Sequence, residues 1–403
     1  MKKIALMILA VSSLATASSV EKVENYLKKE FEDPLKVKCV SNIDISCKVS
    51  NFTKDYFDKK DENIKDNVSI AIKDINIIFK KKILEDLDQV KKEGEESFPN
   101  EDALVNNLTF VKVNKVEAIT KDTNISIKSL SMSKVFTENK YNLPYTGIFK
   151  LNIDNLSETF SSKMLKDELK ENIEGKNERT KEFTELIKDE KSKKMVDSIV
   201  YIIEKTIDAV EKDGNIKASF DTEIRVETTA LNEKDINFKL NLSTNTRIKG
   251  YKDTSSFELS LDLVDQEKLS PMNIRFNYLE LNSYFPSINI YKNLINSDVI
   301  FAQKIKNLND LLLEGDNISN SFITDIRLKQ LSSFVLDKIK NILHGESDKF
   351  YFRLDNKSKK TVQELYKEEG LRLMIAPSEK ENKKAIDQVY ADTFFRVFNI
   401  DIK

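Results

Sequence analysis

The chain has 403 residues, with 65 Lys and Arg against 67 Asp and Glu, and a formal net charge of −2 at pH 7. This length allows two or three ordinary domains or one large body, and the 40% hydrophobic content excludes global disorder. The balanced charge excludes the basic excess expected of a nucleic-acid-binding protein, and 8 Gly and 6 Pro are too few for a propeller rich in tight turns.

The first residues have the pattern of a signal peptide. Two lysines precede an apolar run over 4–11, and Ala15 and Ala17 form a small-x-small cleavage motif. A transmembrane helix needs roughly 20 apolar residues, which neither this run nor any later one provides. We therefore expect residues 1–17 to be a cleaved signal peptide, with an uncleaved anchor as the alternative. The mature protein is then periplasmic and has no transmembrane anchor.

The two cysteines, Cys39 and Cys47, lie in the stretch KVKCVSNIDISCKVS. Apolar alternation on either side predicts two strands joined by a short turn centred on Ile43, which places the cysteines opposite each other. An exported chain enters an oxidising compartment, where paired cysteines form disulfides. We expect a Cys39–Cys47 disulfide. A redox or metal site is disfavoured, because the spacing is not C-x-x-C and no histidine is near.

The stretch NVSIAIKDINIIF carries isoleucines whose spacing slips by one position halfway. They are Ile70, Ile72, Ile75 and Ile77. Similar spacing at 125–132 and 274–281 is close to the chance level and irregular in interval, which excludes a short-period repeat. A bulge at Lys73-Asp74 would return these isoleucines to one face of a bent strand, where they would line an apolar groove. The alternatives are a strand buried on both faces and a helix.

The remaining sequence alternates between strand-like and helix-like sections. Strand-like sections are 104–119, 125–135, 146–153, 218–226, 236–242, 257–263 and 350–354. Helix-like sections are 20–31, 157–212, 287–344 and 381–397. A capping box from Thr361 to Glu364 predicts a helix that ends at Gly370 and is followed by a strand over 371–376.

This pattern predicts an α+β fold, in which long curved antiparallel sheets with amphipathic strands pack against long helices. The strand and helix sections are arranged similarly in two parts of the chain. One interpretation is therefore two similar halves, 18–213 and 214–403, the first ending in a long helical segment. The other is a single continuous elongated body, because no linker rich in Pro, Gly or Ser separates the two parts.

The sequence contains no recognisable catalytic or cofactor-binding motif. The single histidine, His344, precedes Gly345 at a predicted helix end, where a cation suits the helix dipole. G-x-S-x-G, H-E-x-x-H, C-x-x-C and glycine-rich phosphate loops are all absent, so we expect no catalytic residue, no metal ligand and no cofactor. A pair of hydrolase carboxylates cannot be chosen among 67 acidic residues.

One possible modification site is Asn124. The stretch from Asp122 to Ser126 matches the acidic extended form of the N-glycosylation acceptor that some bacteria use. The alternative is the polar beginning of a strand.

These features favour an exported, non-catalytic binding or envelope-assembly protein that carries a lipid or another apolar ligand between sheet and helices. Long amphipathic antiparallel strands covered by helices resemble, in outline, those of periplasmic lipid-handling proteins, an analogy of fold. The alternatives are a structural protein that binds another envelope protein and a carboxylate-dependent hydrolase.

Overall fold

The computed structural model describes only part of the chain. The described residues are 19–30, 36–56, 68–85, 107–119, 123–136, 141, 146–173, 190–265, 270–322, 325–375 and 391–403. The predicted signal peptide over 1–17 and most of the predicted helix over 381–397 lie outside these residues.

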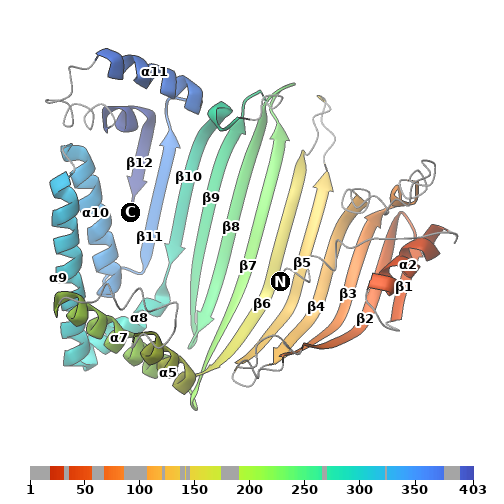
Figure 1. The fold of residues 1–403 in the computed structure, drawn as a ribbon, viewed down its shortest axis with the longest axis horizontal. Helices are drawn as coiled ribbons and strands as arrows, with labels where there is room; N and C mark the ends of the chain where they lie inside the picture. Colours follow the sequence, from red (N-terminus) through yellow and green to blue (C-terminus); the bar gives the residue numbers. More distant parts are fainter. Residues whose placement is uncertain are drawn as a thin grey trace. The chain divides into compact units, whose positions relative to one another are not determined.

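Twelve strands form one open antiparallel sheet, and their order in the sheet is their order in the chain (Figure 1). They are β1 (Lys36–Ser41), β2 (Asp44–Tyr56), β3 (Val68–Lys80), β4 (Leu108–Ile119), β5 (Thr123–Phe136), β6 (Gly147–Ser161), β7 (Asn215–Ala230), β8 (Ile236–Ile248), β9 (Tyr251–Leu263), β10 (Ile274–Tyr284), β11 (Lys349–Asn356) and β12 (Phe398–Ile402). Each strand pairs with the next along the chain. The predicted α+β fold with antiparallel strands is confirmed.

The described helices lie before β1, between β6 and β7, and between the strands from β10 onwards. They are α2 (Ser19–Glu30), α5 (Ser162–Ile173), α7 (Glu190–Val210), α8 (Asn289–Ser297), α9 (Val299–Phe322), α10 (Ile326–Leu343) and α11 (Val362–Ile375). Short 3-10 turns, η3 (Pro271–Asn273) and η4 (Pro286–Ile288), flank β10. Helices α7 and α9 pack together through Ile202, Phe301 and Ile305, and the last two are almost fully buried.

The chain divides into two compact units. The first comprises Met1–Glu138, Gly147–Glu158 and Phe220–Arg225, and the second comprises Asn139–Thr146, Thr159–Ser219 and Val226–Lys403. The boundary therefore passes through β6 and β7. The similarity of two halves at 18–213 and 214–403 stays a prediction.

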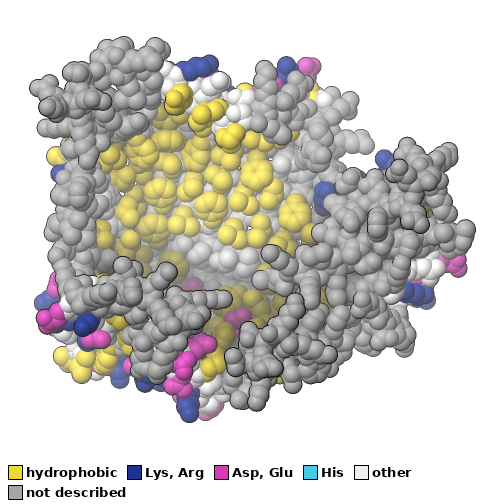
Figure 2. Space-filling view, viewed as in Figure 1, with side chains coloured by type: hydrophobic (Ala, Val, Ile, Leu, Met, Phe, Trp, Pro, Cys, Tyr) yellow, Lys and Arg dark blue, Asp and Glu magenta, His cyan; other side chains and the backbone are white. Residues whose placement is uncertain are grey.

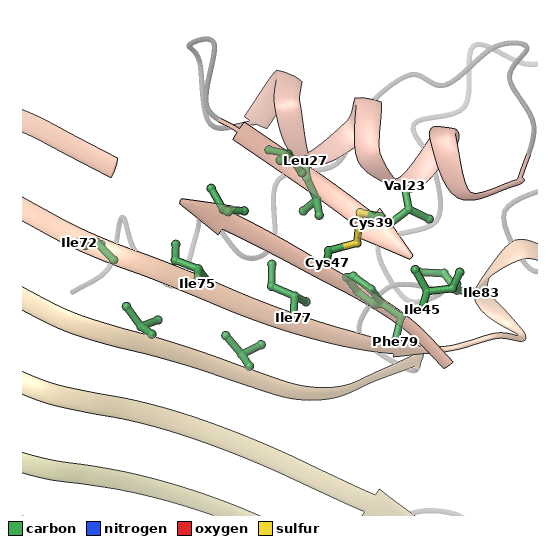
Figure 3. Packing of buried hydrophobic residues seen from close by; sticks show 14 residues of the cluster. Val23, Leu27, Cys39, Ile45, Cys47, Ile72, Ile75, Ile77, Phe79 and Ile83 are labelled. Carbon is green, nitrogen blue, oxygen red and sulfur yellow. A yellow bond between two sulfur atoms is a disulfide. The ribbon is translucent and has the colours of Figure 1, made fainter. Parts of the chain in front are cut away.

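The core of the first unit lies between α2 and the first strands of the sheet (Figure 3). Val23 and Leu27 of α2 are one helical turn apart and are both buried against this part of the sheet. Beneath them, Cys39 lies opposite Cys47 in the register of β1 and β2, and the two form a disulfide with an S–S distance of 2.07 Å. The predicted disulfide is confirmed.

The spacing slip in β3 does not come from a bulge at Lys73-Asp74. Ile72 lies opposite Val116 and Asp74 lies opposite Asn114, so β3 and β4 keep one register through this point. The predicted bulge is therefore wrong, since a bulge would place an extra residue in one strand and shift the register. Instead, the side chains of both strands change face at the same level.

A left-handed residue in β4 accompanies this change of face. Lys115, which the register places opposite Lys73, has a φ of 49°. The isoleucines of β3 then lie together, in or against one core cluster. Ile72, Ile75 and Ile77 are buried in it, and Ile70 packs against it. A groove lined by these four residues stays a prediction, and their burial favours a packing role.

Two predicted boundaries are wrong, the strand predicted over 371–376 is helical as far as Ile375, and one strand was missed. Strand β6 continues to Ser161, so the helical section begins at Ser162 and not at Ser157, because pairing within the sheet extends the strand. Helix α11 passes through Gly370 to Ile375, since the following Leu, Arg and Met residues are good helix formers. Strand β12 was not predicted. The capping box is confirmed, as Thr361 Oγ1 accepts from the Glu364 N–H at 3.2 Å.

Candidate functional site: a partly exposed apolar sheet face

Strands β8 to β12 place apolar side chains on one shared face of the sheet. Leu240 of β8 lies opposite Leu259 of β9, which lies opposite Leu279 of β10. The row continues through Leu354 of β11 to Ile400 of β12. Directly opposite residues of neighbouring strands share a face and touch. One apolar row therefore crosses all of these strands.

Further rows on either side widen this row into a surface that we call the apolar plate. The plate consists of Ile236, Phe238, Leu240, Leu242, Phe257, Leu259, Leu261, Leu263, Ile274, Phe276, Leu279, Leu281, Phe350, Phe352, Leu354, Phe398, Ile400 and Ile402. All of these residues belong to the second unit. Strict alternation over 236–242 of β8 and 257–263 of β9 assigns the apolar residues of these ranges to the plate and the polar residues between them to the other face.

A bulge in β10 keeps the plate continuous. The register of β10 with β9 shifts between Phe276 and Tyr278, so Asn277 is an extra residue. Phe276 and Leu279 are three residues apart and would face opposite ways in a regular strand, yet the bulge puts both on the plate. The Asn277 amide points the other way and donates to Asp262 Oδ1 at 2.7 Å. The apolar spacing at 274–281 is thus explained by a bulge.

The plate is incompletely covered. Within the described residues, no buried core cluster includes a plate residue, and only Ile236 of the plate is itself buried. Figure 2 shows hydrophobic side chains gathered on the visible face of the sheet over β8, β9 and β10. On the opposite face, by contrast, Asp262 is only 7% exposed. Around Asp262, therefore, a polar side chain is more deeply buried than most of the apolar side chains of the plate.

Aromatic rings border the plate on the side of β12. Phe276 and Phe398 meet edge to face with ring centroids 5.7 Å apart. Phe398 also contacts Phe394, of the helical segment 391–397, at 5.3 Å. Helix α11 packs beside β10 and η3 in the same region. This border is fixed by packing, because such ring pairs are favourable beyond their buried area.

Charged side chains connect the strands on the opposite face. Lys239 of β8 pairs with Glu258 of β9 at 2.7 Å, and the hydroxyl of Tyr278 of β10 donates to the same carboxylate. Burial raises the pKa of Glu258, but the hydrogen bonds from Lys239 and Tyr278 outweigh it and hold that pKa below its ordinary value. Arg353 of β11 adds a further ion pair on this face, with Glu280 of β10 at 2.5 Å. The plate therefore lies on strands that are cross-linked from behind.

Helices α7 and α8 pack at one end of the strands, beyond the plate. Their residues Ile207 and Ile290 form a cluster with Ile216, and Ile248 and Tyr251, where β8 meets β9, pack against it. This contact lies beyond the last plate residues of β8 and β9. The helices therefore bury one end of this sheet face.

A shallow depression of about 550 Å³ lies at the other end of β8 and β9. Its lining is Tyr141, Asn232, Glu233, Lys234, Asp235, Val264 and Asp265. The lining is mostly polar and includes no plate residue. It therefore does not match the apolar ligand site that the sequence suggests.

The other residues predicted from the sequence lie apart from the plate. Asn124 is exposed and begins the pairing of β5 with Ile119 of β4. Its modification stays a prediction. His344 is the C-cap residue of α10, and its backbone N–H donates to Lys340 O at 2.9 Å. Its side chain contacts Asn309 of α9, so it joins two helices.

Metal ligation and membrane crossing find no support in the part of the chain that the structure describes. There, no group of three or more His, Cys, Asp or Glu residues is arranged to hold a metal ion. None of the helices in that part is long and apolar enough to cross a membrane.

No protein-family model and no curated protein matches this sequence. The functional inference therefore rests on the plate.

Proposed function

We propose that this protein is an exported, non-catalytic binding protein that carries an apolar ligand on the apolar plate. The observation that supports this proposal is the incomplete burial of a contiguous apolar surface on β8 to β12. Water contact with such a surface is costly, at roughly 25 cal/mol per Å² of apolar area. Large exposed apolar patches accordingly mark binding sites.

The composition of the plate favours a small apolar ligand over a protein partner. The plate consists of Ile, Leu and Phe alone. Protein interfaces are enriched in Tyr, Trp, Phe, Met and Arg, and of these residue types the plate contains only Phe. Aliphatic and Phe side chains instead provide a non-directional surface, which suits a hydrocarbon.

The Cys39–Cys47 disulfide supports a place outside the cytoplasm. Disulfides persist in oxidising compartments such as the bacterial periplasm and are rare in the cytosol. The signal-like sequence over 1–17 agrees with export. We therefore place the binding function in the periplasm.

A paired set of variants tests this function. Leu240→Gln/Leu259→Gln makes the centre of the plate polar, whereas Asn241→Gln/Ser256→Gln makes matched changes on the opposite face of the same strands. We expect the purified protein to release an apolar species in native mass spectrometry and to enhance Nile red fluorescence. The plate variant should lose both signals and the control should keep them. Absence of both signals in the unaltered protein, or equal signals in the two variants, would overturn the proposal.

A further inference from the structure

At one end of the plate, apolar side chains give way to hydroxyls at the same level on adjacent strands. Thr244 of β8 lies opposite Ser255 of β9, and Ser255 lies opposite Ser283 of β10. Each is two residues beyond a plate residue on its own strand, so its side chain belongs to the same face. We call Thr244, Ser255 and Ser283 the hydroxyl band. The plate thus has one end that can form hydrogen bonds.

The band interrupts two apolar regions and is not the edge of the sheet. Beyond it, Ile248 and Tyr251 pack against α7 and α8. A sheet face that served only as core would stay apolar between these regions, because a hydroxyl in a packed layer loses its contact with water. Ser283 is only 5% exposed, whereas Thr244 and Ser255 are half-buried and stay accessible from this face. The band places polar groups where a ligand on the plate would end.

The charges near the band disfavour an anionic ligand. Thr246 and Asp253 form the next level on this face of β8 and β9, and Asp253 accepts from the Ser287 N–H at 2.9 Å. Neither this level nor the band has Lys or Arg on these strands. An anionic headgroup would lie beside a carboxylate of the same sign with hydroxyls as its only partners on the sheet. Hydroxyls both donate and accept, and therefore suit uncharged polar groups.

The dimensions of the plate match hydrocarbon chains that lie along the strands. From Ile236 to Leu242 the plate is about 20 Å long, at roughly 3.3 Å per residue. The hydrocarbon of one bilayer leaflet is about 15 Å thick, half of the roughly 30 Å core. Neighbouring strands lie about 4.8 Å apart, so β8 to β12 offer width for more than one chain. A chain on the plate can extend along its full length with its head at the band.

We infer that the ligand is an acyl-chain amphiphile with an uncharged, hydroxyl-bearing headgroup, whose chain lies on the apolar plate and whose head binds Thr244 and Ser255 of the hydroxyl band. This inference rests on the proposed function and adds the class and the orientation of the ligand. The plate supplies affinity for the chain. The band selects the head, because a charged head would lose hydration that the hydroxyls replace incompletely.

Three probes with one chain and different heads test the class of ligand. They are 1-oleoylglycerol, oleate and oleylamine, each used to displace Nile red from the full mature chain at neutral pH. We expect 1-oleoylglycerol to bind about tenfold more tightly than oleate. If no probe displaces the dye and the dye itself does not bind, the proposed function fails and the inference with it. If all three bind equally, or if oleate binds best, only the headgroup inference is overturned.

A matched pair of variants tests the orientation. Thr244→Val/Ser255→Ala removes the two half-buried hydroxyls of the band with little change in volume, whereas Ser243→Ala/Ser256→Ala removes directly opposed hydroxyls from the other face of the same strands. The band variant should lose the preference for 1-oleoylglycerol while it still binds the chain, and the control should keep the preference. An unchanged preference in the band variant, with circular dichroism confirming that both variants fold, would overturn the orientation.

Discussion

The apolar faces of two sheet regions differ in what covers them. On β1 and β2, helix α2 packs over the strands, and Ile45 and Cys47 have no exposed surface. On β8 to β12, rows of equally apolar residues stay partly exposed, and no core cluster of the described residues contains them. Alternating sequence thus makes a core in one region and a candidate binding surface in the other. The burial of the first face comes from helix α2, which packs over β1 and β2.

The largest expected effect concerns the covered face. Ile45→Ala removes a fully buried side chain of the first unit and leaves a cavity beneath α2. We expect it to lower the free energy of unfolding by about 3 kcal/mol, within the range for large-to-small changes in a core. Urea denaturation followed by circular dichroism measures this, since the chain has no Trp. A loss below about 1 kcal/mol would show that this face is less tightly packed than its burial indicates.

The disulfide gives the covered face a second source of stability. Cys39 and Cys47 have a sequence separation of 8. Closing a loop of this size lowers the conformational entropy of the unfolded chain and so stabilises the folded state by about 2.5 kcal/mol. Cys39→Ala/Cys47→Ala should therefore lower the free energy of unfolding by about this amount, measured without reductant. Binding of Nile red to the plate should stay unchanged. A large loss of dye binding would show that the two regions are not independent.

Helix ends in the second unit should contribute less. Asp325 caps α10 by accepting from the Arg327 and Leu328 N–H groups, and the hydrogen bond from the Arg327 side chain lowers the pKa of Asp325 to about 2. Asp325→Ala should lower the free energy of unfolding by about 1–2 kcal/mol at pH 7, as the loss of a cap does.

The pH dependence of this cap has a defined sign. Because the pKa of Asp325 is lower in the folded protein than its ordinary 3.8, its stabilisation is complete above pH 3.8 and is lost as pH falls towards 2. The difference in unfolding free energy between the variant and the unaltered protein should shrink over this interval. A difference that stays constant down to pH 2 would contradict the ion pair.

The smallest expected effect on stability concerns the plate. Leu259→Ala removes a side chain that already contacts water, so we expect a loss of about 1 kcal/mol or less in the free energy of unfolding. Dye binding should nevertheless fall severalfold. A loss of 3 kcal/mol would mean that Leu259 belongs to a core, and the contrast with Ile45 would disappear.

Local sequence patterns predicted the strands up to β11, the disulfide and the capping box. Strict alternation assigned one polar face to β8 and β9, and the spacing around Cys39 and Cys47 predicted their pairing. These features depend on neighbours in the chain or on a short turn. The sequence therefore contains the information that they need.

The candidate site depends on relations that such patterns do not contain. Each strand of the plate has the apolar face of an ordinary half-buried strand, and local sequence does not indicate that the described helices form no core cluster with it. The slip at 274–281 arises from a bulge, whereas the slip of β3 is matched on β4 without a change of register. The apolar spacing is alike in the two stretches, so the sequence alone does not distinguish a bulge from a change of face that the neighbouring strand matches. Strand β12 was missed because its pairing with β11 joins residues far apart in the chain.

Photo-crosslinking tests the central claim most directly. An acyl probe with a diazirine on its chain is bound to the mature protein, activated by light and located by peptide mass spectrometry. We expect crosslinks on peptides from β8 to β12, and their loss in the Leu240→Gln/Leu259→Gln variant. Crosslinks on α2 and β1 to β3, or labelling that the plate variant leaves unchanged, would contradict the assignment of the plate as the ligand site.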